Sequence, residues 1–143
     1  MAEHVLVDAP VLDALVARIF VAAGCDAAEA ARISTHLLGA NLAGHDSHGV
    51  ARVPRYVEWL QAGFVVRDQT AEIITDGGCF ALLDGKFGFG QTVAPQAVAL
   101  GIARAQQHGI AVVGLRNAGH IGRVGDYAEM AIRAGLISIH FVN

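Results

Sequence analysis

The sequence predicts a mixed α/β protein in which an N-terminal helical segment is followed by a partial sheet packed by helices. Two observations predict this class. Residues 8 to about 62 carry apolar side chains at helical spacing, whereas from about residue 71 short apolar runs alternate with Ala-rich helical stretches. We therefore expect a helical segment over 1–66 and a partial α/β domain over 67–143 that is truncated at its C-terminus.

The first helix is expected to begin at Asp8, a capping residue, with Pro10 in its opening turn, and to end at Gly24. Its expected apolar face consists of Val11, Leu15, Ile19 and Phe20.

Two further helices are expected before residue 64. Asp26 and Glu29 form a D-x-x-E variant of the capping box, which opens the second helix, and Gly44 is a plausible stop. The third helix should begin near Arg52 or Val53, because Pro54 would remove a hydrogen bond deeper inside it, and it should end at Gly63.

Strands and helices alternate in the second part. The runs AEIITD and CFALLD, bounded by glycines, predict a strand pair, and IAVVGL predicts a buried strand. Helices are expected over 91–107 and 124–134, and LISIHFVN is expected to be a final strand.

The composition excludes some classes of protein. Of 143 residues 54% are hydrophobic and 16% charged, and the net charge is −3 with scattered basic residues, so no nucleic-acid partner is expected. No apolar run reaches the roughly 18 residues of a membrane span, so we expect no membrane association and a cytoplasmic protein. The apolar excess indicates either an oligomer or a missing covering portion. Cys25 and Cys79 are expected to be buried, reduced thiols.

The segment GHDSHGVARVPRY, residues 44–56, is the first candidate site. Unpaired N–H groups near the start of the third helix attract an anion, and Arg52 could clamp a carboxylate with two hydrogen bonds. The alternative is that Asp46 or Ser47 caps the helix, His48 packs and Arg52 is solvated. His45 and His48 lie three residues apart, but a zinc site needs a third protein ligand, so we expect no metal; a metal-dependent hydrolase stays an alternative.

The segment NAGHIGRVGDY, residues 117–127, is the second candidate site. His120 follows a predicted strand, which is a common place for function in α/β sheets, and imidazole can give and take a proton near neutral pH. Glycines at 119, 122 and 125 would let the backbone approach a ligand closely. The alternative is a structural histidine in a tight turn. The remaining histidines are expected to be structural or surface residues: His4, His36, His108 and His140.

Neither glycine-rich segment is a dinucleotide fingerprint, because GKFGFGQT has Val93 where G-x-G-x-x-G requires glycine, and GHIGRVG lacks its G-x-G start. Instead, three strings resemble the malate/L-lactate dehydrogenase family, which includes ureidoglycolate and sulfolactate dehydrogenases and cyclic-imine reductases. The strings are GHDSHGVARVPRYVEWLQAG, GKFGFGQTVAPQAVALGIARAQQHGIAVVGLRNAGHIGRVGDYAEMA and RAGLISI.

The resemblance implies a non-Rossmann domain that binds NAD or NADP, a 2-hydroxy or 2-oxo acid as substrate, and a homodimer. It implies that His120 is the acid/base. Ser47, His48 and Arg52 would hold the substrate, with Arg52 pairing its carboxylate, and Tyr56 would line the same pocket. The cofactor-binding residues stay unknown.

Two departures from the family pattern stand out. Many members carry Ser-Asn before the histidine, whereas this chain has Ala118 and Gly119, so the substrate subgroup stays open. Family members are also about twice as long or more, so we expect a truncated protein, a gene fragment or one piece of a split chain that is inactive alone. The alternative is a non-catalytic assembly module, or a partner-dependent subunit of a split enzyme.

Overall fold

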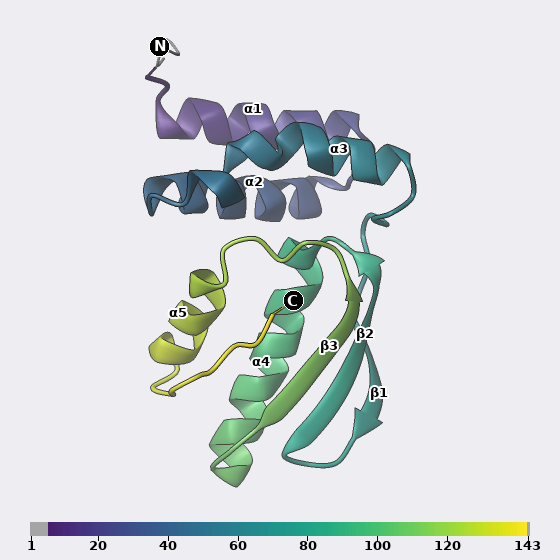
Figure 1. The fold of residues 1–143 in the computed structure, drawn as a ribbon, viewed down its shortest axis with the longest axis vertical. Coiled ribbons are helices and arrows are strands. Elements are labelled where there is room, and N and C mark those ends of the chain that lie inside the picture. Colours follow the sequence, from purple (N-terminus) through teal and green to yellow (C-terminus); the bar gives the residue numbers. More distant parts are fainter. Residues whose placement is uncertain (1–5, 143) are drawn as a thin grey trace.

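The computed structural model describes residues 6–142, in which a layer of helices lies against one end of an α/β unit (Figure 1). The helical layer contains α1 (Ala9–Ala22), α2 (Ala27–Leu42) and α3 (Val53–Gln61). Two short 3-10 turns, η1 (Asp46–His48) and η2 (Val50–Arg52), join α2 to α3. The three expected helices are confirmed, with starts and stops close to those predicted.

The α/β unit contains three strands and two helices. The strands are β1 (Glu72–Asp76), β2 (Phe80–Gly88) and β3 (Val112–Ala118), and the helices are α4 (Gly90–His108) and α5 (Gly125–Arg133). The sheet order is β1-β2-β3, with β1 antiparallel and β3 parallel to β2. Helix α4 makes the crossover between the parallel strands and packs on them, and α5 packs on α4 (Figure 1).

The buried face of α1 differs from the expected one. Val16 and Phe20 are buried, whereas Val11 and Leu15 are exposed. Ile19 is partly buried against the same core. The prediction was wrong for Val11 and Leu15 because the apolar stripe of α1 is wider than the surface that its neighbouring helices cover.

Only half of the predicted capping box forms. The Glu29 N–H donates to Asp26 Oδ1 at 2.6 Å, as a cap requires. The Glu29 carboxylate does not reach back to Asp26; it accepts instead from the Asp68 N–H at 2.6 Å and from Thr92 Oγ1 at 2.7 Å. Asp68 Oδ1 in turn accepts from the Asp26 N–H at 2.9 Å. A fully buried carboxylate therefore ties α2 to α4 and to the chain before β1.

Two apolar cores meet near the start of α4. The first lies among the three N-terminal helices and includes Phe89, whose ring packs edge-on against Phe20 with centroids 5.8 Å apart. The second lies between the sheet and α4 around Ala81, Leu83 and Ala97. Because Phe89 immediately precedes α4, the helical layer and the α/β unit are packed together at that point.

Three expectations about the strands need correction. β2 runs beyond Gly85 to Gly88, with a break in its pairing to β3 between Asp84 and Gly88. β3 is half exposed rather than buried, because only β2 flanks it. Residues 136–142 form no strand, since no neighbour pairs with them, and Ile137 is 98% exposed; Asn143 lies outside the described residues.

The cysteines differ from each other. Cys25 is buried, as expected, whereas Cys79 is exposed in the turn between β1 and β2, so the expectation of burial was wrong for Cys79. Between residues 6 and 142, no helix combines the length and the hydropathy that crossing a membrane requires.

Candidate active site

The two segments that the sequence singled out meet where the helical layer contacts the α/β unit. Tyr56 lies on α3, and its hydroxyl oxygen is 2.8 Å from Nδ1 of His120, which follows β3. The His48 ring stacks on the His120 ring, with centroids 5.5 Å apart and planes 25° apart. Tyr56 and His48 precede His120 by 64 and 72 positions in the sequence, yet the three side chains form one cluster.

The turn before α3 is held by Asn41, which the sequence reasoning missed. Its amide nitrogen donates to Asp46 Oδ1 at 2.6 Å, and its oxygen accepts from the Val50 N–H at 2.8 Å. A Cβ on Gly49 would lie only 2.1 Å from that amide oxygen. Glycine at position 49 is therefore required for this bridge, and the bridge fixes the backbone that carries Ser47 and His48.

Ser47, His48 and Arg52 are linked within this turn. Ser47 Oγ lies 2.9 Å from His48 Nδ1, and Arg52 Nε donates to the Ser47 carbonyl at 2.6 Å. Within residues 6–142 no carboxylate forms an ion pair with Arg52. The rest of its guanidinium group is therefore available to an anionic ligand.

The hydrogen bonds around His120 define its tautomer. Gln91 Nε2 donates to the Tyr56 hydroxyl oxygen at 3.0 Å, so the single Tyr56 proton is left for His120 Nδ1. The Gly122 N–H also points to Nδ1, at 3.2 Å. With two donors at Nδ1, the ring proton lies on Nε2.

Burial lowers the pKa of His120 below its ordinary value, and the positive charge of Arg52, followed by the neighbouring imidazoles of His48 and His36, lowers it further. Burial also raises the pKa of Tyr56 to about 12, against opposing effects of Gln91 and Arg52. At neutral pH the pair is therefore a neutral imidazole and a neutral phenol. Such a ring can exchange a proton with a ligand at Nε2.

The glycines near His120 have a packing role. A Cβ at position 119 would lie 2.9 Å from the Gly88 carbonyl oxygen, and one at 122 would lie 2.6 Å from His36 Nε2. A Cβ at 125 would lie 2.9 Å from the guanidinium of Arg123. These glycines allow the loop to pack on its own chain; that they also let the backbone approach a ligand stays a prediction.

His36 has a more specific place than the structural or surface role expected of it. Its side chain is 10% exposed, its Nδ1 lies 3.1 Å from Asp126 Oδ2, and its ring lies 5.6 Å from that of Tyr127. His36 Nε2 is buried and makes no hydrogen bond of ordinary geometry. The spacing of His36 from the motif residues does not predict its contact with Asp126, because that contact depends on how α5 packs near α2. His108 and His140 form no part of the cluster, and His4 lies outside the described residues.

The two histidines of the first segment do not converge on a metal. His45 Nδ1 is 3.0 Å from the Ala43 carbonyl oxygen, whereas His48 contacts Ser47. In the part of the chain described, 6–142, no three His, Cys, Asp or Glu side chains group as metal ligands would. The geometry gives no support to the hydrolase alternative.

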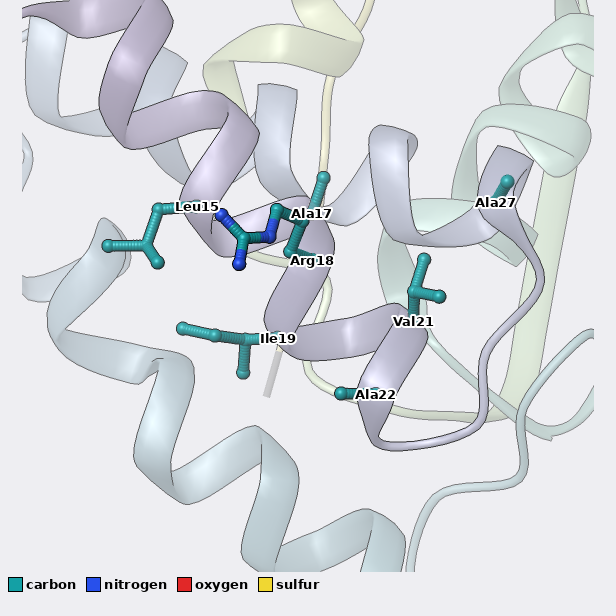
Figure 2. A pocket seen from close by; sticks show the side chains of 7 residues that line it. All are labelled: Leu15, Ala17, Arg18, Ile19, Val21, Ala22 and Ala27. Carbon is teal, nitrogen blue, oxygen red and sulfur yellow. The ribbon is translucent and has the colours of Figure 1, made fainter.

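Two surface hollows lie away from this cluster. Figure 2 shows one of about 620 Å³ on the outer side of α1. It is lined by Leu15, Ala17, Arg18, Ile19, Val21, Ala22 and Ala27. A second, of about 570 Å³, includes Arg32, Thr92 and Gln96 between α2 and α4. Neither of these two hollows is lined by His120 or Arg52.

The site therefore groups two histidines, a tyrosine and an arginine without an ion-pair partner in residues 6–142, on a mixed α/β scaffold. The chain belongs to the malate/L-lactate dehydrogenase family, whose model matches residues 7–143. The resemblance found in the motifs and the mixed α/β fold class are both confirmed.

Relatives and solved structures agree with this assignment. The chain is 44% identical over 136 residues to hydroxycarboxylate dehydrogenase B of Escherichia coli K12, which covers 95% of this chain and 38% of that protein. It is 39% identical over 132 residues to malate dehydrogenase of Pyrococcus abyssi, covering 92% and 36%. The structure of a putative malate/lactate dehydrogenase from E. coli matches with a TM-score of 0.86 and 43% identity, over 90% of this chain and 36% of that one. The chain therefore spans little more than a third of the length of these relatives.

Proposed function

We propose that this chain carries the proton-transfer and acid-binding part of an NAD- or NADP-dependent oxidoreductase that interconverts 2-hydroxy and 2-oxo acids. The observation that carries the proposal is the 2.8 Å contact between Tyr56 Oη and His120 Nδ1, which brings the acid/base to the turn of Arg52. The relatives support it, since their names include hydroxycarboxylate, malate, L-lactate and L-sulfolactate dehydrogenases.

His120 is the proposed acid/base. In the reducing direction the doubly protonated ring donates its Nε2 proton to the carbonyl oxygen and becomes neutral; in the oxidising direction a neutral ring with a bare Nε2 takes the proton of the hydroxyl group. Because burial and nearby positive charge lower the pKa of His120, the neutral ring predominates at neutral pH and protonated ring increases as pH falls.

Arg52, with Ser47 and His48, is proposed to hold the acid group of the substrate, and Tyr56 to line the same site. The guanidinium of Arg52 is fixed through Nε to the Ser47 carbonyl, which leaves its terminal nitrogens for a carboxylate. The stacked His48 ring covers one face of His120. The substrate carboxylate would therefore be bound next to the nitrogen that exchanges the proton.

Neither glycine-rich segment of the described chain has the G-x-G-x-x-G spacing of a dinucleotide-binding motif. We propose that the nucleotide is held mainly by parts outside these residues, in a cytoplasmic homodimer of the whole enzyme, and that this chain alone does not turn over substrate. NADH or NADPH fluorescence and absorbance with a series of 2-oxo acids test this; turnover by the isolated chain would refute it.

The acid-binding role is tested by adding pyruvate to ¹⁵N-labelled protein while the ring signals of His48 and His120 are followed. We expect both signals to shift with pyruvate and to stay in place with acetone, the same ketone without a carboxylate. Arg52→Gln should abolish the pyruvate response, whereas Arg55→Gln, on the exposed side of α3, should retain it. An equal response to acetone, or an unchanged response in Arg52→Gln, would refute the role of Arg52.

A further inference from the structure

Gln91 is a buried polar residue at the start of α4 that contacts both partners of the proposed proton-transfer pair. It is 2% exposed, and its Nε2 donates to Tyr56 Oη at 3.0 Å and to the His120 carbonyl oxygen at 3.2 Å. Its Oε1 is buried and has no hydrogen-bond partner. A buried amide with an unused acceptor beside a tyrosine hydroxyl is uncommon, because most buried polar atoms are hydrogen-bonded.

The orientation of this amide determines the direction of the hydrogen bonds beyond it. An amide nitrogen can only donate, so while Nε2 faces Tyr56 the hydroxyl proton must point to His120 Nδ1. If the amide turned over, Oε1 would face the hydroxyl and accept its proton. Tyr56 Oη would then accept from Nδ1–H of His120, and the ring proton would leave Nε2.

The two arrangements prepare His120 for opposite tasks. With Gln91 Nε2 toward Tyr56, His120 presents Nε2–H, a donor for a carbonyl oxygen. With Oε1 toward Tyr56, His120 presents a bare Nε2, an acceptor for a hydroxyl proton. Two contacts favour the first arrangement in the structure described. The Gly122 N–H lies 3.2 Å from Nδ1, and the His120 carbonyl oxygen, which accepts from Gln91 Nε2 at 3.2 Å, would face another acceptor if the amide turned over.

We propose that Gln91 is a positioning residue which, through Tyr56, sets the ring nitrogen of His120 that carries the proton. Its importance for turnover rests on the proposed function of His120. The tautomer itself is a property of the chain without substrate or nucleotide, and it is measured independently of activity.

The test is the side-chain ¹H–¹⁵N spectrum of His120 in the labelled chain, which distinguishes the two neutral tautomers. The signals are assigned from their loss in His120→Gln. We expect Nε2–H in the native protein. Gln91→Glu should convert the ring mainly to Nδ1–H at a pH where the new carboxylate is ionised, because a carboxylate only accepts and draws the Tyr56 proton away from Nδ1.

A second variant covers the case in which a buried glutamate stays protonated or the protein does not fold. Gln91→Met keeps the length of the side chain but neither donates nor accepts, so Tyr56 is no longer oriented and both tautomers of His120 should be populated. Gln107→Glu adds the same charge to the exposed end of α4, roughly 24 Å along the helix, and should leave the spectrum unchanged.

Two results would overturn the inference. One is a native His120 that carries its proton on Nδ1; the other is an unchanged Nε2–H tautomer in both Gln91 variants. Failure of a longer form of this chain, with NADH or NADPH present, to reduce 2-oxo acids would refute the proposed function and leave these spectra as they are.

Discussion

At the scale of single residues, the charge around His120 is dominated by burial and by Arg52. Arg52 is the second cause of the low pKa of His120, after burial. Since no carboxylate in the described chain neutralises its guanidinium, the whole of its charge disfavours a proton on the ring. A bound substrate carboxylate would neutralise that charge and raise the pKa of His120, so binding and proton affinity are coupled.

Arg52→Gln is expected to raise the pKa of His120, because the positive charge that opposes protonation is removed while the size of the side chain is nearly kept. The measurement is a pH titration of the His120 ring signals in the chain without ligand. Arg55→Gln is the matched control, since Arg55 is exposed on α3, three residues beyond Arg52, and pairs with Glu58. A lower or unchanged pKa in Arg52→Gln would contradict this account of the site.

The two cysteines are expected to react at very different rates. Cys79 is exposed, whereas Cys25 is buried and its pKa is raised to about 12, first by burial and then by the charge of Glu29 and Asp68. Because the thiolate is the nucleophile, iodoacetamide at pH 8 should modify Cys79 and leave Cys25 intact until denaturant is added. Mass spectrometry of the alkylated peptides measures this, and early labelling of Cys25 would show that α1 and α2 open readily.

At the scale of elements, Glu29 determines how α2 meets α4. Glu29→Ala removes the acceptor of the Asp68 N–H and the Thr92 hydroxyl, leaving one buried and one part-buried donor without partners. We expect a loss of roughly 2–4 kcal/mol in the free energy of unfolding. Urea unfolding followed by circular dichroism measures the loss. Glu58→Ala, at an exposed position of α3, should change stability by less than about 1 kcal/mol; equal effects would show that the buried network contributes little.

Glycine is needed at position 122, in the loop between β3 and α5, for two separable reasons, and Gly135, just after α5, shares one of them. Gly122 and Gly135 both have φ near +74°, at 73° and 74°. A Cβ at 122 would meet His36 Nε2 at 2.6 Å, whereas one at 135 would meet nothing within 4 Å. Gly135→Ala should therefore cost about 1 kcal/mol from backbone strain, and Gly122→Ala roughly 1–3 kcal/mol more from overpacking. Thermal unfolding of the two variants gives the difference directly, and equal losses would contradict the steric contact at His36.

Element boundaries were predictable where local chemistry sets them. Asp26, Pro54 and Gly109 mark helix ends that the structure retains, with Gly109 in the left-handed region at φ 81°. The absence of the expected strand over 136–142 was not predictable in this way, because a strand needs a neighbour to pair with and composition shows only that the residues are apolar.

The site was predictable to a similar degree. The motifs identify Ser47, His48, Arg52, Tyr56 and His120, and the structure brings the last four into contact or into mutual electrostatic range. Gln91 and Asn41 were missed, because a buried amide has no periodicity or spacing of its own. Their roles follow from the approach of α4 and of η2, which only tertiary packing determines.

At the scale of the whole molecule, the candidate site lies at the junction of the helical layer and the α/β unit. Val65 and Phe89 belong to the core of the N-terminal helices, although they lie beyond α3. The packing of Phe89 and the Tyr56–Gln91–His120 hydrogen bonds join the helical segment to the α/β domain. The division of the chain into two domains at residue 66 therefore stays a prediction. A site built across such a junction is fixed by both cores, which suits the sub-ångström placement that proton transfer requires.

The apolar excess of the sequence corresponds to two exposed features, the open edge of the sheet at β3 and the apolar side chains after α5. Within residues 6–142, β3 has no strand on its outer side, and the segment that follows α5 exposes Ile137, Ile139 and Phe141. An open strand edge and exposed apolar side chains are both surfaces on which another chain can associate. We expect the isolated chain to self-associate, with an average mass that rises above 14.9 kDa between low and high micromolar concentration in light scattering.

Replacing Ile137, Ile139 and Phe141 together by serine should return the mass toward that of the monomer. The contacts that favour association are then removed, while the fold is retained because these side chains do not pack into it. Serine at Val11 and Leu15, exposed on α1, is the matched control and should leave the association unchanged. A chain that is monomeric at every concentration, or one that is dissociated only by the α1 substitutions, would show that association does not use the β3 side of the molecule.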